Sequence, residues 1–246
     1  MLAVIGGSGL TRLPGFESSG EHTVSTPYGA PSAPLISGTL GGARMVFLAR
    51  HGNSHSIAPH DINYRANIWA LKNEGVSRIV SVATVGGIGE RFPPGALVVP
   101  HQLIDYTWGR AHTFFGDGEP VTHVDFTEPY SEDIRSALLW AAGASGEPVV
   151  ADAVYAVTQG PRLESAAEIN RLERDGADIV GMTAMPEAVL AREKGIGYGA
   201  LAVVANYAAG RGDSRNRIDL EAIHAVHGEA MLRVVRVLAK VAEKFQ

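Results

Sequence analysis

Residues 155–187 read YAVTQGPRLESAAEINRLERDGADIVGMTAMPE. An extended apolar run opens this stretch, a Gly160-Pro161 turn follows, and a polar helical segment leads into a second apolar run. A strand, a helix and another strand in this order are typical of a sheet covered by helices. Ligands of such sheets gather at strand ends, where the connecting loops lie.

Short β-branched runs recur along the chain and are predicted to be buried strands. They are LAVIGG at 2–7, RMVFLARHG at 44–52, SRIVSVATVGG at 77–87, ALVVPHQLI at 96–104, DAVYAVTQG at 152–160, ADIVGMT at 177–183 and YGALAVVAN at 198–206. Helices are predicted at about 61–74, with Asp61 as N-cap, and at about 164–175, 187–194 and 219–244. We therefore expect an α/β fold, with one domain over residues 1–246 and a mixed, largely parallel twisted sheet flanked by helices.

Composition excludes several classes of protein. The 246 residues carry a formal net charge of -5 without a run of Lys or Arg, which argues against binding nucleic acid. The N-terminal MLAVIGGSG has no basic region and only a short apolar run, so we expect neither a signal peptide nor a membrane span. The absence of Cys excludes disulfides, thiolate zinc sites and a cysteine nucleophile, and is compatible with the cytoplasmic location that we expect.

Several further motifs accompany the two strands of the opening stretch. They are GGSGL at 6–10, ARHG at 49–52, NYRANIWALK at 63–72, VGGI at 85–88 and HQLIDYT at 101–107. In this order, together with GPRLE and GMTAMPE, they resemble the nucleoside phosphorylase family over nearly the whole chain. The resemblance is to the trimeric branch that holds purine nucleoside and methylthioadenosine phosphorylases. It implies a homotrimer that acts on a small nucleoside, with orthophosphate as co-substrate and no cofactor.

The candidate phosphate residues are ambiguous when taken alone. GGSGL is as much a tight structural turn as an anion cradle, and Arg50 at a strand end is more often a solvated surface residue. His51, His55 and His60 do not have the spacing of a zinc site, so no metal is expected. The resemblance implies that Arg50 clamps phosphate and that His51 adds a donor. It places the remaining phosphate contacts at Ser8, the backbone of Thr84, and Thr183.

Other residues are placed around the nucleoside by the same resemblance. Met182, which is otherwise more typical of a core, packs under the ribose. His123, which alone is more typical of a surface loop, reaches the site from a neighbouring subunit. The rest of the nucleoside site is then lined by Val85, Gly86, Leu163, Glu164, Asn206, Ala208 and Ile218.

Three of these positions bear on the choice of substrate. A carboxylate at Glu164 accepts a hydrogen bond from the protonated N1 of a 6-oxopurine, whereas adenine N1 carries no proton. Adenosine-type relatives have Asp where this chain has Asn206 and Ala208, and the Asn206 amide is suited to donate to O6 and N7. Ile218 offers no hydrogen bond to a ribose 5′-hydroxyl, but an apolar methylthio group fits beside it.

The expected reaction is phosphate-dependent cleavage of the N-glycosidic bond of S-methyl-5′-thioinosine, giving hypoxanthine and 5-methylthioribose 1-phosphate. Asn206, Arg50 and His51 are the expected catalytic residues. Two alternatives within the family are phosphorolysis of inosine or guanosine and phosphorolysis of S-methyl-5′-thioadenosine. A nucleoside or phosphate binding protein on the same fold is the alternative outside enzymes.

Overall fold

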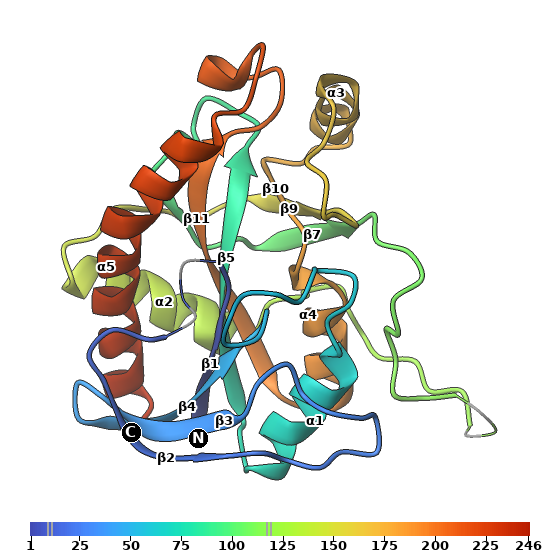
Figure 1. Ribbon diagram of the computed structural model, residues 1–246, viewed down its shortest axis with the longest axis vertical. Helices are drawn as coiled ribbons and strands as arrows, with labels where there is room; N and C mark the ends of the chain where they lie inside the picture. The colour runs from blue at the N-terminus through green and yellow to red at the C-terminus, as the bar shows by residue number, and fades with distance from the viewer. Residues whose placement is uncertain (9, 11, 117, 119) are drawn as a thin grey trace.

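An 11-stranded sheet with helices around it forms the body of the computed structural model (Figure 1). The structure describes residues 1–8, 10, 12–116, 118 and 120–246, with only the backbone of residues 222, 224, 225 and 227. The strands are β1 (Leu2–Gly6), β2 (Phe16–His22), β3 (Leu35–Leu40), β4 (Ala43–Ala49), β5 (Arg78–Gly87), β6 (Leu97–Val98), β7 (Gln102–Asp105), β8 (Val149–Val150), β9 (Val154–Val157), β10 (Ile179–Gly181) and β11 (Gly197–Tyr207). The helices are α1 (Tyr64–Asn73), α2 (Glu132–Ala144), α3 (Ala166–Arg174), α4 (Ala184–Glu193) and α5 (Leu220–Lys244), and a 3₁₀ turn spans Gly212–Ser214.

The predicted α/β fold is confirmed, including the mixed and largely parallel sheet. Every predicted strand is present, and the run at 96–104 divides into β6 and β7 on either side of Pro100, which cannot donate a ladder hydrogen bond. Asp61 was wrong as the N-cap of α1, because Asn63 holds this position and accepts from the backbone N–H of Ala66. The sequence analysis missed β2, β3, β8 and α2.

Two long strands, β5 and β11, run parallel to each other through the centre of the sheet (Figure 1). The other edge of β5 is divided between two shorter strands. β1 pairs in parallel with residues 78–81, and β10 pairs antiparallel with residues 86–87. Within the described part of the chain, no strand therefore lies beside residues 82–85 on that edge. This interruption leaves room for a site between the end of β1 and β10.

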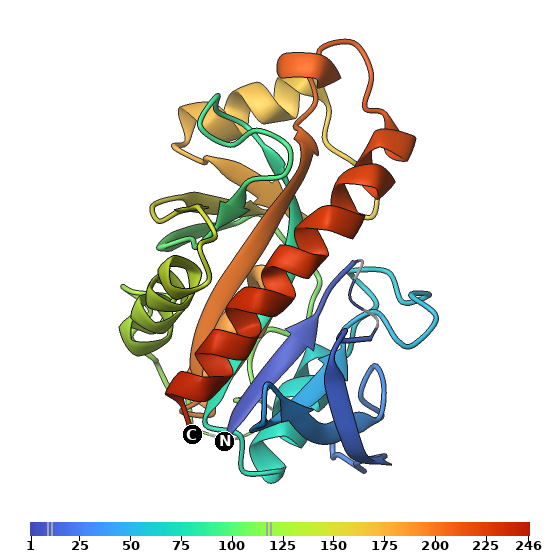
Figure 2. The ribbon, with the colours of Figure 1, turned by 90° about the vertical axis from the view of Figure 1, so that its left-hand side faces the viewer.

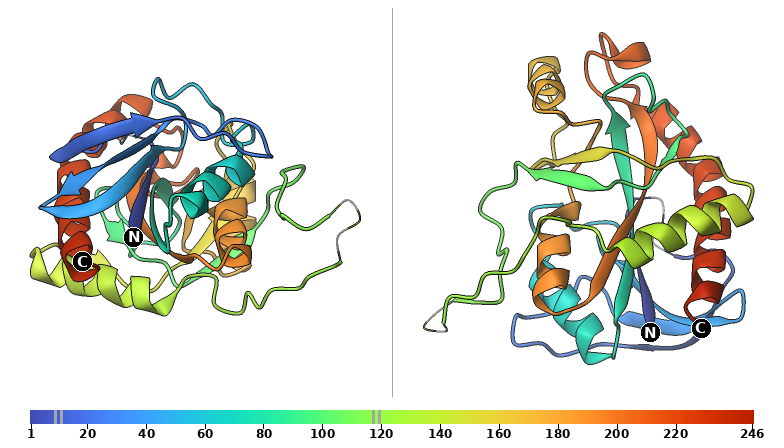
Figure 3. Two further views of the ribbon diagram at one scale, coloured as in Figure 1. Left: turned by 90° about the horizontal axis from the view of Figure 1, so that it is seen from below. Right: turned by 180° about the vertical axis from the view of Figure 1, so that it is seen from behind.

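Helices cover the central strands from two sides. α2 and α5 contact each other and β11, and Figure 2 shows α5 running along β11. α1 and α4 contact each other on the opposite side of these strands (Figure 3). The segment that joins β7 to α2 extends away from the body of the molecule in the same figure. No described helix is long and apolar enough to cross a lipid bilayer.

Candidate active site

A cavity of about 600 Å³ lies beside residues 83–86 of β5, where the edge of the sheet is interrupted. Loops that follow β1, β4, β9, β10 and β11 close around it, together with the start of α5. The predicted site residues that line it are Ser8, Arg50, His51, Thr84, Val85, Gly86, Leu163, Glu164, Met182, Thr183, Asn206, Ala208 and Ile218. Among the predicted set, His123 alone does not line this cavity.

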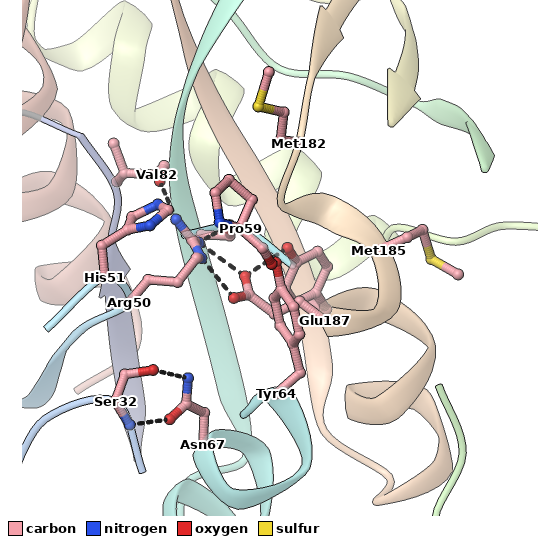
Figure 4. Close-up of polar contacts among 12 residues, drawn as sticks. Ser32, Arg50, His51, Pro59, Tyr64, Asn67, Val82, Met182, Met185 and Glu187 are labelled. Carbon is pink, nitrogen blue, oxygen red and sulfur yellow. Dashed lines mark hydrogen bonds and ion pairs between the residues drawn. The ribbon is translucent and has the colours of Figure 1, made fainter. Parts of the chain in front are cut away.

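Arg50 is held by a network of buried hydrogen bonds (Figure 4). Its side chain is fully buried, and its Nε and Nη2 donate to the two oxygens of Glu187 at 2.7 and 2.9 Å. Nη2 also donates to Ser81 Oγ at 2.7 Å, and Nη1 donates to the Val82 carbonyl at 3.0 Å. Tyr198 completes the network by donating its hydroxyl to Glu187 Oε1 at 2.9 Å.

This network fixes both the charge and the direction of Arg50. Burial lowers the pKa of the guanidinium, but the Glu187 carboxylate outweighs burial and leaves the pKa above its ordinary value. A guanidinium has five N–H groups, and the described contacts engage four of them. One N–H on Nη1 has no partner among the residues that the structure describes. The clamp that the resemblance implies at Arg50 therefore has one uncommitted donor in the described geometry and not the whole planar fork.

His51 lies next to this network and is also held in place. Its Nδ1 is 2.8 Å from the carbonyl of Ile57, and its ring centroid is 4.6 Å from that of His55. Burial, and secondarily the charge of Arg50, lowers the pKa of His51 to about 4. Burial also lowers the pKa of His55. Both imidazoles are thus neutral at physiological pH.

The loop after β1 lies against these side chains. Ser8 Oγ is 3.4 Å from His55 Nε2, and Thr84 Oγ1 donates to the Ser8 carbonyl at 3.4 Å. A Cβ at Gly7 would lie 2.6 Å from the Val82 carbonyl oxygen, so only glycine lets the loop approach β5 this closely. Gly9 of the predicted anion cradle lies outside the described residues.

Glu164 and Asn206 face the same cavity and are each fixed by a short hydrogen bond. Glu164 Oε1 accepts from Thr158 Oγ1 at 2.6 Å. Asn206 Nδ2 donates to the Tyr207 carbonyl at 2.6 Å, and the pairing of β11 with β5 is irregular between Val204 and Asn206. Such a bulge re-aims a side chain next to a site. Since one amide N–H donates to Tyr207, only the other has no partner among the described residues, whereas the sequence analysis expected both to be available for O6 and N7.

The remaining wall of the cavity is apolar. Ile218 contributes to it, together with Leu220 and Ile223 from the start of α5, which the sequence analysis missed. Met182 also lines the cavity, and a Cβ at Gly160 would lie 2.4 Å from its sulfur. Gly160 has a φ of 62°, a conformation that favours glycine, and a side chain at this position would displace that of Met182.

Two buried charged residues near the site were also missed. Glu187 is 0% exposed and stands within the apolar GMTAMPE motif, where a lone carboxylate signals a buried partner. Arg110 donates to the carbonyls of Met182 and Met185 at 2.8 and 2.6 Å and to that of Gln159 at 2.8 Å. It thereby ties the loops after β9 and β10 together. Its neighbours in sequence gave no sign of these distant carbonyl partners.

Several curated relatives match most of the chain. One from Pseudomonas syringae pv. tomato, named as a probable S-methyl-5′-thioinosine phosphorylase, is 51% identical over 240 residues, 97% of each chain. Another of the same name, from Xanthomonas campestris pv. campestris, is 55% identical over 215 residues, 87% of this chain and 86% of the relative. A 6-oxopurine nucleoside phosphorylase from Pyrococcus furiosus is 48% identical over 216 residues, 85% of this chain and 80% of the relative.

The fold has a close counterpart among solved structures. Methylthioadenosine phosphorylase from Schistosoma mansoni in complex with adenine superposes with a TM-score of 0.95 at 31% identity, covering 99% of this chain and 91% of that one. The family resemblance predicted from the motifs is confirmed by these relatives and by a match of residues 1–243 to a single family. The chain belongs to the phosphorylase superfamily.

Proposed function

We propose that the protein is a purine nucleoside phosphorylase that cleaves S-methyl-5′-thioinosine with phosphate, giving hypoxanthine and 5-methylthioribose 1-phosphate. The observation that carries this proposal is the joint lining of one cavity by Glu164, Asn206 and an apolar wall at Ile218. The polar pair is suited to a 6-oxopurine, and the wall is suited to a methylthio group rather than a hydroxyl. The names of the bacterial relatives support the same substrate.

Phosphate and the nucleoside contact different groups of residues in the cavity. The phosphate half of the cavity comprises Ser8, Arg50, His51, Thr84 and Thr183. The nucleoside half comprises Val85, Gly86, Leu163, Glu164, Met182, Asn206, Ala208 and Ile218. Thr84 and Gly86 belong to the same strand, so β5 joins the halves and sets their separation.

In the proposed reaction, a phosphate oxygen forms a bond to C1′ of the sugar while the bond from C1′ to N9 breaks. The electron pair of that bond leaves with the purine, which is then protonated from water. Phosphate charge stabilises the developing ribosyl cation, and the free N–H of Asn206 stabilises the charge that accumulates on the base. Glu164 orients the purine by accepting from N1–H. The scheme uses orthophosphate as co-substrate and no cofactor or metal.

A phosphorolysis assay with four substrates tests the proposal. S-methyl-5′-thioinosine, S-methyl-5′-thioadenosine, inosine and guanosine are compared at equal concentration, with and without phosphate. We expect the first to be cleaved fastest, arsenate to replace phosphate, and no reaction without either anion. Full activity in phosphate-free buffer would identify a hydrolase. A preference for inosine would favour the activity named for the Pyrococcus furiosus relative.

We further propose that the active form is a cytoplasmic homotrimer with its sites at subunit boundaries. His123 is exposed and lies on the segment that extends from the body between β7 and α2. Trp108 and Val121 on the same segment are 73% and 82% exposed, which suits a surface that packs against another chain. Sedimentation of the wild type and of His123→Ala tests this arrangement. A fully active monomer would remove His123 from the site.

A further inference from the structure

Arg110 holds two loops of the cavity from outside it. Its side chain is 8% exposed and is not part of the described cavity lining. Nη2 donates to the carbonyls of Thr158 and Gln159 at 3.3 and 2.8 Å, after the end of β9. Nη1 donates to those of Met182 and Met185 at 2.8 and 2.6 Å, after the end of β10. One guanidinium therefore joins the loops that follow two neighbouring strands.

A third contact extends this connection to the phosphate half. Nη1 of Arg110 donates to the Tyr64 hydroxyl at 3.2 Å, and that hydroxyl donates to the Pro59 carbonyl at 2.9 Å. Figure 4 shows Tyr64 and Pro59 next to the network around Arg50. Pro59 lines the cavity and lies between β4 and α1, in the same connection as His51. Arg110 is therefore connected to the backbone of both halves.

The backbone that Arg110 holds carries side chains of the nucleoside half. Thr158 Oγ1 donates to Glu164 Oε1 at 2.6 Å, and the Thr158 N–H donates to the Gly181 carbonyl at 2.8 Å. Gly181 directly precedes Met182, which lines the cavity. The directions of Glu164 and Met182 thus depend on the same framework.

The contacts of Arg110 are those of a clamp on the backbone, not of an ion pair. Each of its hydrogen-bond partners in the described part of the chain is an uncharged oxygen, including Gln159 Oε1 at 3.3 Å from Nε. A buried cation without a counter-charge is costly, and well-packed apolar side chains often stabilise a fold as much. Stability alone therefore does not account for Arg110. Arginine offers a rigid planar fork with five N–H groups, which reaches several fixed acceptors at once.

The chain around Arg110 is itself anchored to the protein. The Phe114 N–H donates at 2.7 Å to Glu193, the last residue of α4. Lys194 Nζ lies 4.1 Å from the centroid of the Phe114 ring. Since α4 begins directly after Thr183, one helix supports both the segment that carries Arg110 and the loop that Arg110 holds.

We propose that Arg110 is a positioning residue that sets the separation of the two halves without touching either substrate. The inference rests on the proposed phosphorolysis and deepens it, because this separation matters only where phosphate attacks C1′ of the nucleoside. β5 joins the halves through the sheet, and Arg110 joins the loops that follow β9 and β10 to the connection after β4. Reacting atoms must approach within about 3–3.5 Å, and a displacement of about 1 Å commonly lowers the rate about 10²-fold.

Single-turnover phosphorolysis by Arg110→Met tests this role. We expect the rate constant of cleavage to fall about 10²-fold because alignment is lost. The KM values for phosphate and for the nucleoside should change less than about threefold, because each half keeps its own contacts. Single-turnover rates exclude an effect of product release. A large rise of either KM with an unchanged cleavage rate would show that Arg110 acts in binding, and would overturn the proposal.

Two milder variants decide the matter if Arg110→Met does not fold. Arg110→Lys keeps the cation but replaces the planar fork by a point charge, so cleavage should stay at least about tenfold below the wild type. Tyr64→Phe removes only the link to Pro59, so cleavage should fall about tenfold with little change of KM. Wild-type cleavage rates in both variants would overturn the proposal.

Arg135 provides a matched control, because it also holds backbone carbonyls. Its Nη1 donates at 3.1, 3.3 and 2.8 Å to the carbonyls of Val99, Pro100 and Ala151, which are not part of the described cavity lining. Arg135→Met should lower the melting temperature, as Arg110→Met does, but should leave single-turnover cleavage within about twofold of the wild type. Equal cleavage rates in the two variants would reduce Arg110 to a structural role and overturn the proposal. Absence of any phosphate-dependent cleavage by the wild type would instead overturn the proposed function.

Discussion

The phosphate half and the nucleoside half of the cavity are built in opposite ways. In the phosphate half, Arg50 and Glu187 are 0% exposed and fix each other through two hydrogen bonds. In the nucleoside half, Leu163 is 42% exposed, and Leu220, which extends its apolar wall, is 61% exposed. The first half is preorganised within one chain, and the second remains open. Under the proposed function, recognition of the co-substrate is therefore part of the folded core, whereas recognition of the nucleoside depends on surfaces that are still open in the single chain.

The largest effect should come from breaking the buried ion pair of the phosphate half. Glu187→Gln leaves the Arg50 cation buried without its counter-charge. We expect the free energy of unfolding to fall by about 3–5 kcal/mol. Denaturant unfolding followed by circular dichroism measures this loss. The exposed pair of Lys240 and Glu243 provides a control, because Glu243→Gln should cost less than about 1 kcal/mol.

A double variant separates stability from function in the same network. In Arg50→Met/Glu187→Leu both charges are removed together, so stability should return to within about 2 kcal/mol of the wild type. Phosphorolysis should remain lost, because the Nη1 donor is absent. Equal stability of Glu187→Gln and wild type would show that the pair is not the rigid centre of the phosphate half.

The next effect concerns the pH dependence of stability. His51 has a pKa of about 4 in the folded chain against 6.5 in the unfolded chain, so only the unfolded chain binds the proton between these values. Stability should therefore fall as pH drops from about 6.5 to about 4, by an amount on the order of 3 kcal/mol. The difference in unfolding free energy between wild type and His51→Gln, measured across this range, isolates the contribution. Parallel profiles would contradict the buried, neutral state of His51.

The same contrast explains what the sequence could predict. Strands such as β11 can be predicted from the sequence, because a strand buried on both faces is a continuous hydrophobic segment. The polar strand β2 is exposed along its middle and carries no such pattern, so it was missed. Motifs at strand ends identified residues that the fold brings together around one cavity. The motifs could not show that most N–H groups of Arg50 donate to Glu187 and to the backbone. Those partners come from distant parts of the chain.

Within the nucleoside half, exchange of the base-recognition residues should alter the choice of purine. In Asn206→Asp combined with Glu164→Ser and Ala208→Asp, carboxyl groups replace the amide and a hydroxyl replaces the N1 acceptor. The ratio of kcat/KM for S-methyl-5′-thioadenosine over S-methyl-5′-thioinosine should rise by roughly 10². Asn206→Asp alone should depress turnover of the 6-oxopurine, since two acceptors then face each other. An unmoved ratio would show that Asn206 does not select the base.

The smallest effect should appear at the apolar wall, which selects the 5′ substituent. Ile218→His introduces a group that hydrogen-bonds a 5′-hydroxyl where the wild type has only hydrocarbon. The ratio of kcat/KM for inosine over S-methyl-5′-thioinosine should rise about tenfold, because one added hydrogen bond contributes about 0.5–1.5 kcal/mol. Ile218→Val is the matched control, since it stays apolar and should leave the ratio nearly unchanged. The variants are compared at saturating phosphate, so that an effect on the phosphate half does not enter the ratio. An equal change of this kcat/KM ratio in both variants would mean that side-chain volume, not polarity, decides the preference for the 5′ substituent. The nucleoside half of the cavity would then select its substrate by shape alone.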